Sequence, residues 1–229
     1  MFAARAAWPC LSKENIIEAS TITPPTVLQA TALRFSFPGQ ELFGGLSLRV
    51  PAGVTLVRGG DGRGKSTLLR LLAGALLADA GRLRINGLSL DAEPAAYRGR
   101  VFWADPDADA FEQMTARDYF ASVRGRYPGF DERALAALIE GLSLGPHLDK
   151  FLYMLSTGSK RKVWLAAAFA SGAVVVLLDQ PFASLDKISI AFVLDLLRGE
   201  TRQGARAWVV ADYEAPRDVP LAALIDLGD

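Results

Sequence analysis

This sequence lacks an excess of charge of either sign, a set of cysteines and a long apolar run. Its single cysteine, Cys10, excludes an internal disulfide framework and suits a reducing compartment. The 25 basic and 25 acidic residues cancel, whereas a protein that coats nucleic acid normally carries a basic excess. The longest apolar run, 163–178, is shorter than the ~20 residues that span a bilayer. We therefore expect a protein without a membrane span that binds no nucleic acid.

Apolar residues are abundant enough to build the core of one domain. The chain has 229 residues, and 51% of them are hydrophobic. Residues 1–26 are predicted to be a flexible N-terminal extension that ends in Thr23-Pro24-Pro25, which leaves the domain over 27–229. The stretch from Met1 to Cys10 is too short and interrupted for a secretory core, so no targeting segment is expected.

Strand-like and helix-like patterns alternate along the domain. Strands are predicted at 27–37, at 46–50 after a Gly44-Gly45 turn, at 54–57, 83–86, 101–103, 174–178 and 207–210, and near Leu224. Helices are predicted at 66–77, 115–125, 131–143, 157–170 and 187–199. This alternation predicts an α/β layered fold with a mostly parallel sheet. The helical block at about 113–157 interrupts it and is expected to form a small helical subdomain.

A glycine-rich loop lies between the predicted strand at 54–57 and the helix that follows it. Its sequence satisfies G-x-x-x-x-G-K-[ST], and the residues expected to hold a nucleotide are Gly59, Gly60, Asp61, Gly62, Arg63, Gly64, Lys65, Ser66 and Thr67. The glycines let successive backbone N–H groups point at phosphate oxygens, and the helix start adds its positive dipole end. Lys65 is a cation for the outer phosphates, and the Ser66 hydroxyl can ligate Mg²⁺. The loop therefore predicts ATP-Mg²⁺ binding.

The apolar strand at 174–178 runs into a carboxylate, Asp179. Such a residue lies at the carboxyl edge of the sheet, where α/β folds bind ligands. A carboxylate at this edge can hold Mg²⁺ through its waters. We therefore predict that Asp179 and Ser66 together serve the metal ion.

Between these two elements lies Leu155-Ser156-Thr157-Gly158-Ser159, which resembles the LSGGQ signature of ABC-type ATPases. Ser184-Leu185-Asp186 matches that family's D-loop, and Gln180-Pro181 stands where the family has Glu-Pro. The resemblance runs from about Val27 to the end of the sequence. In length and signature the chain looks most like the small bacterial ATPases of multi-component transporters, of which the heme-exporter ATPase of cytochrome c maturation is one type.

The resemblance implies a P-loop NTPase fold, with a RecA-like parallel sheet, an antiparallel β subdomain and a small helical subdomain. It implies that two ATP-binding domains stack head to tail, so that ATP lies between one phosphate loop and the partner's signature. Ser156, Gly158 and the D-loop Asp186 would then face the partner's nucleotide. Phe37 falls where the family places an aromatic that stacks on adenine, although a core phenylalanine is a rival interpretation. The implied partners are a homodimer or heterodimer mate and an integral membrane permease, with the chain at the inner face of the cell membrane.

Three positions depart from the family's pattern. Gln180 replaces the catalytic carboxylate, and an amide can orient water but cannot accept a proton. Asp212 occupies the position of the family's His, where a carboxylate would be repelled by phosphate, so it is expected to point away, to be protonated or to mark a different closed state. The family's sheet-to-helix Gln is missing after Val101-Phe102-Trp103, and no Gln occurs before Gln113. Asp105 or Asp107 could take over Mg²⁺ ligation, or the acidic run could be a solvated loop.

These observations leave open competing functions. The leading hypothesis is the ATP-binding subunit of a membrane transporter, as a homodimer or as a heterodimer whose second chain supplies Glu and His. A non-hydrolysing ATP-sensing or assembly module is the alternative, motivated by Gln180 and Asp212. A nucleic-acid-linked ATPase of this class would need coiled-coil insertions or tandem cassettes, for which the length leaves no room. The only histidine, His147, is expected at the surface.

Overall fold

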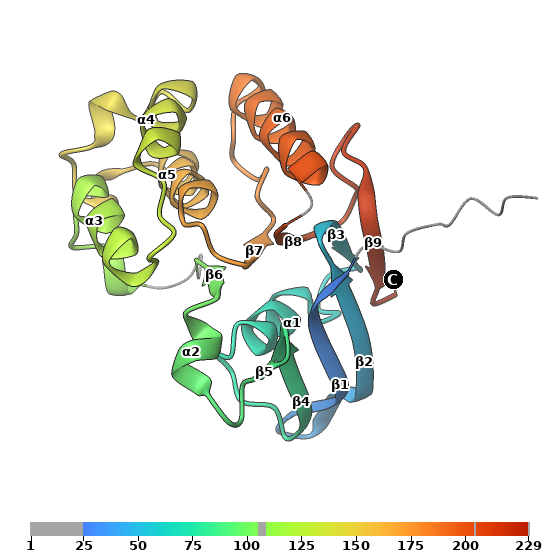
Figure 1. Ribbon diagram of the computed structural model, residues 1–229. Helices are drawn as coiled ribbons and strands as arrows, with labels where there is room; N and C mark the ends of the chain where they lie inside the picture. Colours follow the sequence, from blue (N-terminus) through green and yellow to red (C-terminus); the bar gives the residue numbers. More distant parts are fainter. Residues whose placement is uncertain (1–24, 105–108, 204, 229) are drawn as a thin grey trace, which may run out of the picture.

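The computed structural model describes residues 25–104, 109–203 and 205–228. In this part of the chain a parallel sheet lies between a helical layer and a second, antiparallel sheet (Figure 1). Most of the predicted extension at 1–26 falls outside the described residues, as do Asp105 and Asp107. No helix in the described ranges combines the length and apolar character that a bilayer crossing requires.

The parallel sheet has five strands in the order β6-β7-β8-β3-β9. The strands are β6 (Val101–Trp103), β7 (Val175–Asp179), β8 (Ala207–Asp212), β3 (Gly53–Arg58) and β9 (Leu221–Asp226). Every neighbouring pair is parallel, so the prediction of a mostly parallel sheet is confirmed. Because the strands are parallel, the residues after β3, β7 and β8 meet at one edge of the sheet.

Side chains alternate between the two faces of the parallel sheet, and each face has its own core. Val175 and Leu177 of β7 pack in the cluster that contains helix α1 (Lys65–Leu72) and the antiparallel strands. Val176 and Leu178 pack on the other face, with α5 (Thr157–Ala170) and α6 (Lys187–Gln203). Burial on both faces explains why this strand is a continuous apolar run in the sequence.

The second sheet has the order β2-β1-β4-β5 and is antiparallel throughout. Its strands are β1 (Thr26–Phe37), β2 (Gln40–Pro51), β4 (Ala80–Ile85) and β5 (Leu88–Ser89). The expected turn at Gly44-Gly45 is wrong, because the chain reverses at Pro38-Gly39, where Gly39 has φ 83°. Gly44 and Gly45 lie inside β2, near register shifts in the β1–β2 pairing. Glycines that look like a turn signal therefore mark a bulge.

Helix α1 ends earlier than the predicted boundary at residue 77. Gly74 has φ 66°, and its N–H donates to the Leu71 carbonyl while the Ala75 N–H donates to the Arg70 carbonyl. This pair of bonds is a Schellman motif, in which a left-handed glycine satisfies the last helical carbonyls and stops the helix. The short helix α2 (Pro94–Arg98) was not predicted, because five residues carry too little periodicity.

The helical layer consists of α3 (Ala116–Arg126) and α4 (Glu132–Gly141) together with α5 and α6 (Figure 1). Short 3₁₀ turns η1 (Asp109–Phe111), η2 (Gly145–His147) and η3 (Leu152–Met154) connect these helices. The first turns of α3 and α4 are capped by side chains, since Thr115 accepts from the Asp118 N–H and Asp131 from two N–H groups. Helices α3 and α4 both pack on α5, which carries the signature residues into the same layer.

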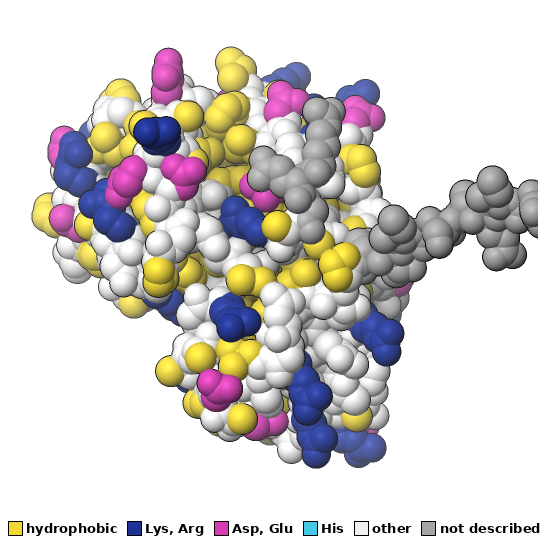
Figure 2. Space-filling view, viewed as in Figure 1, with side chains coloured by type: hydrophobic (Ala, Val, Ile, Leu, Met, Phe, Trp, Pro, Cys, Tyr) yellow, Lys and Arg dark blue, Asp and Glu magenta, His cyan; other side chains and the backbone are white. Residues whose placement is uncertain are grey.

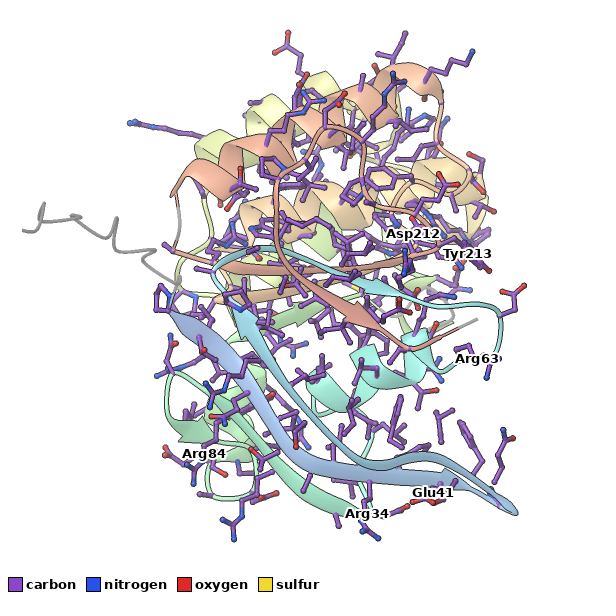
Figure 3. The ribbon with its side chains drawn as sticks, turned by 90° about the vertical axis from the view of Figure 1, so that its right-hand side faces the viewer. Arg34, Glu41, Arg63, Arg84, Asp212 and Tyr213 are labelled. Atoms are coloured by element: carbon purple, nitrogen blue, oxygen red, sulfur yellow. The ribbon has the colours of Figure 1, made fainter. Side chains whose placement is uncertain are left out.

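Charge is unevenly distributed over the surface despite the neutral total. The outward face of the antiparallel sheet carries the exposed side chains of Arg34, Arg49, Arg82 and Arg84. Figure 2 shows Lys and Arg side chains gathered over the region of β1 and β4, and Figure 3 shows Arg34 and Arg84 on these strands. The neutral total therefore describes the whole chain and not each of its faces.

Candidate functional site

The phosphate loop, residues 59–67, connects the end of β3 to the start of α1. Gly62 has φ 72° and Gly64, the residue before the helix, has φ 90°. Both values lie in the left-handed region that glycine adopts without strain. Within the described residues, the backbone N–H groups of Gly62, Arg63 and Gly64 have no acceptor. These groups are therefore available to an anion at the positive end of α1.

The side chain of Lys65 turns back over its own loop. Its Nζ donates to the Gly59 carbonyl at 2.6 Å and to the Gly60 carbonyl at 2.8 Å. The residue is only 7% exposed, so these bonds compensate for the desolvation of a buried ammonium. The ring of Tyr213 lies over the same ammonium, with its centroid 4.2 Å from Nζ.

The base of the phosphate loop is held by the residues at and after β9. The Gly60 N–H donates to the Gly228 carbonyl at 3.0 Å, and the Leu227 N–H donates to the Arg58 carbonyl at 2.8 Å. Arg58 and Asp226 form an ion pair that lowers the pKa of this carboxyl group. A Cβ at Gly59 would lie 3.1 Å from that of Leu227, so the close approach favours glycine here. No motif in the sequence predicts that residues at and after β9 hold the phosphate loop.

A cavity of about 290 Å³ opens beside the phosphate loop. It is lined by Phe37, Leu42, Gly60, Asp61, Gly62, Arg63, Gly64, Lys65, Ser66, Thr67 and Gln180. The structure thus brings Phe37, from the end of β1, to the same cavity as the loop. Phe37 is 47% exposed and meets the buried Phe35 edge-to-face at 5.0 Å, so its free face is accessible for stacking. Whether adenine uses that face stays a prediction.

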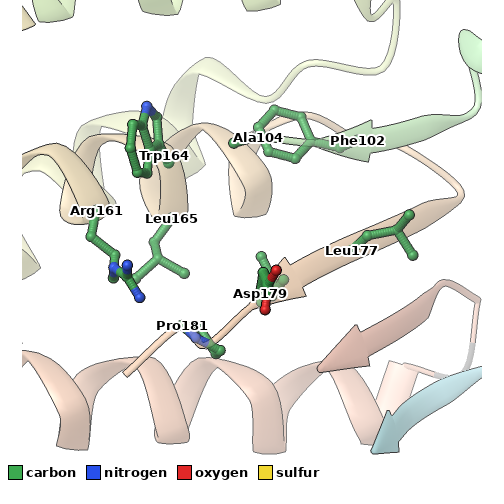
Figure 4. Close-up of a pocket in the computed structure, with 9 residues that line it drawn as sticks. Phe102, Ala104, Arg161, Trp164, Leu165, Leu177, Asp179 and Pro181 are labelled. Atoms are coloured by element: carbon green, nitrogen blue, oxygen red, sulfur yellow. The ribbon is translucent and has the colours of Figure 1, made fainter. Parts of the chain in front are cut away.

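Asp179 lies at the carboxyl end of β7, opposite α5 (Figure 4). It borders a small cavity of about 30 Å³ that Arg161 and Trp164 of α5 also line. Arg161 is a residue that the sequence interpretation missed, and it follows the signature by only two positions. Its guanidinium donates to the Gln180 carbonyl; burial lowers its pKa, against the attraction of Asp179 and Asp212. The predicted metal carboxylate therefore has a cation close by.

Gln180 is held in an uncommon backbone conformation. Its φ is 42°, in the left-handed region, and its N–H donates to the Ala211 carbonyl at 2.9 Å. Non-glycine residues in this region carry conformational strain that the surrounding structure must impose, and such residues cluster at functional sites. Gln180 also lines the phosphate-loop cavity, and that its amide orients a water beside a terminal phosphate stays a prediction.

Asp212 and Tyr213 lie at the end of β8, on the same side of the molecule as Arg63 of the loop (Figure 3). Asp212 Oδ1 accepts the Tyr213 N–H at 2.8 Å. Burial raises the pKa of Asp212, while this bond and the nearby Lys65 oppose the shift. Asp212 lines a second cavity, bounded by α6 and the segment after β8, and not the one beside the loop. The raised pKa favours protonation, one of the expected consequences, whereas the electrostatic effects of Lys65, Asp179 and Arg161 show that the carboxylate stays close to the site.

The signature residues begin helix α5. Ser156 is the N-cap, and its Oγ accepts the Ser159 N–H at 3.2 Å. A Cβ on Gly158 would stand 2.4 Å from the Ser184 carbonyl oxygen, so only glycine allows the D-loop to pack here. Ser184 itself has φ 62°. The two motifs that the resemblance identified are therefore in direct contact with each other.

Asp186 is engaged in local interactions at the start of α6. It accepts from the Ser189 N–H at 2.8 Å and the Ser189 hydroxyl at 2.9 Å, and it pairs with Lys162 at 2.7 Å. The Lys162 bond, followed by those from Ser189, lowers its pKa well below the usual range. Ser156, Gly158 and Asp186 do not line the phosphate-loop cavity in the described part of the chain. Their expected contact with a nucleotide would have to be made across a dimer.

Two further expectations concern residues of the helical layer. His147 is partly exposed, which does not contradict its expected place at the surface, and its Nδ1 has no hydrogen-bond partner among the described residues. Burial, with the charges of Lys150 and Lys162, lowers its pKa. Gln113 is exposed and lies outside the phosphate-loop cavity. Neither residue belongs to the candidate site.

The donor set suits a magnesium nucleotide. The unpaired N–H groups of the loop and the Lys65 ammonium are anion donors, and Phe37 offers an aromatic face. Within the described residues no group of three or more His, Cys, Asp or Glu gathers to hold a metal ion by itself. Ser66 and Asp179 supply hard oxygen ligands, so a magnesium ion here would complete its coordination with phosphate oxygens and water.

A phosphate loop between a parallel strand and its helix, with a carboxylate at the end of another strand of the same sheet, defines a P-loop nucleotide-binding protein. The sequence profile of the ABC transporter family matches residues 43–183. A cytochrome c biogenesis ATP-binding export protein CcmA from Pseudomonas savastanoi pv. phaseolicola is 31% identical over 90% of this chain and 98% of its own. The CcmA of Rhodospirillum rubrum is 36% identical over 82% and 80%.

A solved ATP-binding subunit of an ABC transporter has the same fold, with a TM-score of 0.74, 23% identity and coverage of 82% of this chain and 80% of its own. The chain therefore belongs to the ABC transporter family of ATP-binding proteins, and it is similar to the small bacterial members of the CcmA type. Members of this family are ATPases in general. The resemblance stated from the signature and D-loop is thus confirmed.

Proposed function

We propose that this chain is the ATP-binding subunit of a membrane transporter, and that it binds ATP-Mg²⁺ with its own hydrolytic half-site impaired. The observation that carries the proposal is the cavity of about 290 Å³ in which the phosphate loop, Phe37 and Gln180 meet. The names of the similar bacterial proteins, ATP-binding export proteins of cytochrome c biogenesis, support a role in export.

In this proposal, ATP binding depends on backbone and side-chain groups that already lie at the phosphate loop. The loop N–H groups and the dipole of α1 surround the inner phosphates, and Lys65 exchanges its bonds to Gly59 and Gly60 for bonds to the outer phosphates. Ser66 and Asp179 would hold the magnesium ion, directly or through water. The bound ion would neutralise charge on the outer phosphates.

Cleavage lacks the group that accepts a proton. Gln180 can orient a water through its amide, but a general base typically contributes about 10²–10⁴ in rate. Asp212, where the family has a His, supplies a carboxylate rather than a donor; two unit charges 4 Å apart repel by about 4 kcal/mol at an effective dielectric of 20. The same carboxylate has a raised pKa because it is half-buried. ATP is therefore expected to be held for long periods before it is cut.

The signature requires a second chain. Ser156 and Gly158 lie outside the cavity formed by the loop of the same chain, as head-to-tail stacking would require. In a heterodimer, this chain would lend Ser156 and Gly158 to ATP bound by a partner that has its own Glu and His. A permease in the membrane would then place the dimer at the inner face of the cell membrane.

The proposal can be tested by measuring ATP hydrolysis and the molecular mass in solution on the same samples. We would follow phosphate release and light scattering at saturating ATP-Mg²⁺, for the chain as given and for Gln180→Glu. For the chain as given, the proposal expects ATP binding with slow release of phosphate. For Gln180→Glu it expects faster release of phosphate and a dimer. A monomer in both proteins would exclude the homodimer, and copurification of one copy each of two ATPase chains would favour the heterodimer. Absence of ATP binding would refute the proposal as a whole.

A non-hydrolysing ATP-sensing or assembly module is the second candidate. The paired changes at Gln180 and Asp212 favour it, because both affect the terminal phosphate. It predicts tight ATP binding with negligible phosphate release, which Gln180→Glu would not restore. A turnover rate ordinary for the family, unchanged by Gln180→Glu, would contradict this candidate.

A further inference from the structure

Arg161 joins the helix that carries the signature to the peptide that follows β7. It lies on α5, two positions after the signature residues 155–159, and its guanidinium donates to the Gln180 carbonyl. Arg161 also lines the small cavity at the end of β7, together with Asp179 and Pro181 (Figure 4). The side chain therefore connects the helical layer to the segment that leaves the parallel sheet.

The backbone of Gln180 needs support from its surroundings. Its φ of 42° is uncommon for a residue with a side chain, so its hydrogen bonds help to decide whether this conformation persists. The Gln180 N–H donates to the Ala211 carbonyl at 2.9 Å, which fixes one side of the residue to β8. The Gln180 carbonyl accepts the Ala183 N–H at 3.1 Å, but this bond lies within the turn over 180–183 and moves with it. The bond from Arg161 ties the same carbonyl to the helical layer.

An arginine suits this position for chemical reasons. A hydrogen bond from a charged donor is stronger than one between neutral groups. The guanidinium is partly buried, and the carboxylates of Asp179 and Asp212 attract it to this edge of the sheet. Its planar fork of N–H donors loses less conformational freedom on binding than a flexible ammonium does. The bond therefore helps to fix the direction in which residue 180 leaves the strand, and this residue lines the phosphate-loop cavity.

We propose that Arg161 is a positioning residue, which holds the peptide of residue 180 so that the side chain of this residue faces the terminal phosphate in the phosphate-loop cavity. The inference rests on the proposed ATP site and concerns a residue that acts through its neighbour. An arginine with a purely structural role would stabilise the helical layer as a whole. A positioning arginine affects residue 180 in particular, so the two roles differ in what a substitution changes.

The first test follows the side-chain amide of Gln180 by NMR and needs no turnover. The Gln180 signal is the one that is absent from Gln180→Glu, and in the unmodified chain it should shift when the β,γ-imido analogue of ATP binds with Mg²⁺. In Arg161→Met this shift should be largely lost, while the dissociation constant of the analogue, measured by calorimetry, changes by less than about twofold. Arg133→Met removes an exposed arginine of α4 and should change neither quantity.

The second test measures turnover in chains that also carry Gln180→Glu, in which phosphate release is expected to be faster. Adding Arg161→Met should lower kcat about tenfold and leave KM within about twofold. Arg161→Lys keeps a charged donor without the planar fork, so it should lower kcat by only about threefold. This partial rescue by the conservative variant distinguishes the loss of a donor from a general change in the packing of α5.

The outcomes separate this inference from the proposed function. A Gln180 shift in Arg161→Met equal to that of the unmodified chain, or a kcat unchanged by Arg161→Met, would overturn the positioning role even if the melting temperature fell. If Arg161→Met does not fold, Arg161→Lys decides in the same way, since an unchanged shift and an unchanged kcat would contradict the role. Failure of the unmodified chain to bind the analogue would instead refute the ATP site. If Gln180→Glu stayed slow, the hydrolytic part of the proposed function would fail, and the amide shift would still decide the role of Arg161.

Discussion

The phosphate loop and the strand-end cluster, by which we mean Asp179, Gln180 and Asp212, lie at the same edge of the parallel sheet but are built differently. The loop owes its shape to glycines at φ 72° and 90° and to the start of a helix. The strand-end cluster depends on side-chain identity, and the proposed function rests on Gln180 and Asp212 standing where the resemblance places the family's Glu and His. Binding is a property of backbone geometry here, whereas cleavage is a property of individual functional groups.

Under the proposed function, this difference explains how the catalytic half of a site can change while the phosphate loop persists. Replacing a loop glycine would strain the backbone and close the cradle, so the loop tolerates little. Replacing a catalytic carboxylate by its amide changes hardly any volume, and the fold is unaffected. If the two regions are independent, a substitution in one should leave the property of the other unchanged.

The largest effect is expected for the strand-end cluster in Gln180→Glu. Restoring a proton acceptor should raise the rate of phosphate release by about 10²-fold or more, with a similar ATP dissociation constant. Steady-state phosphate release at saturating ATP measures it. Gln113→Glu, at an exposed position outside the cavity, is the matched control and should leave the rate unchanged. An equal rate in Gln180→Glu would show that another group limits hydrolysis.

Within the phosphate loop, Lys65→Ala should weaken ATP binding by about 30-fold, because a charge-assisted contact to phosphate is lost. Calorimetric titration with ATP-Mg²⁺ gives the constant. Lys150→Ala changes an exposed lysine of the helical layer and serves as the comparison. Should both variants bind ATP alike, the loop would not hold phosphate in the way proposed.

Phe37→Ala should weaken ATP binding by about fivefold through loss of stacking on adenine. Inorganic triphosphate has no base, so its affinity should be unchanged, and competition titrations can compare the two ligands. Phe151→Ala, also at an exposed phenylalanine, provides the control. A fall in melting temperature without any change in affinity would instead favour the packing role that the sequence left open.

The smallest effect concerns the charge of Asp212. Because the folded-state pKa of Asp212 is raised above 3.8, its protonated form stabilises the fold, and this contribution is lost as the pH rises through the raised value. Asp212→Asn should therefore melt at a higher temperature at pH 7, and the difference should vanish below pH 3.8.

Asp149→Asn gives the opposite sign and serves as the control for Asp212→Asn. The hydrogen bond from Arg117 lowers the pKa of Asp149. The charged form of Asp149 therefore stabilises the fold at pH values above 3.8, and this contribution is lost as the pH falls through the lowered pKa. Melting curves of the two variants between pH 3 and pH 7 make the comparison. A lower melting temperature for Asp212→Asn at pH 7 would contradict the burial of a charge at the end of β8.

Much of the fold was predictable because each element had its own local signal. The apolar run of β7, the capped starts of α4 and α5, and the glycine-rich motif each carry the physical cause of their structure in sequence. The β-hairpin turn was mistaken because Gly44-Gly45 competes with Pro38-Gly39, and only pairing along two long strands decides between them. The early end of α1 depends on one left-handed glycine, Gly74, within an otherwise helical pattern.

The site was predictable where a motif is contiguous and not where it is assembled from distant segments. Arg161 and Tyr213 reach the site from α5 and from the end of β8, and neither stands at a position that spacing alone would single out. The contact of Gly158 with Ser184 likewise joins residues from separate elements. Such contacts depend on tertiary packing, which patterns in a single sequence do not predict.

The pairing of β3 has a consequence for how the chain matures during synthesis. Its neighbours in the sheet are β8 and β9, and residues at and after β9 hold the base of the phosphate loop. A ribosome makes β3 and the loop long before it makes either neighbour, so the strand emerges without partners. The support of the phosphate loop is therefore completed only when the most distant strands have been made. Until then the only partners available to β3 are the segments made before it, among them the antiparallel strands that share its core.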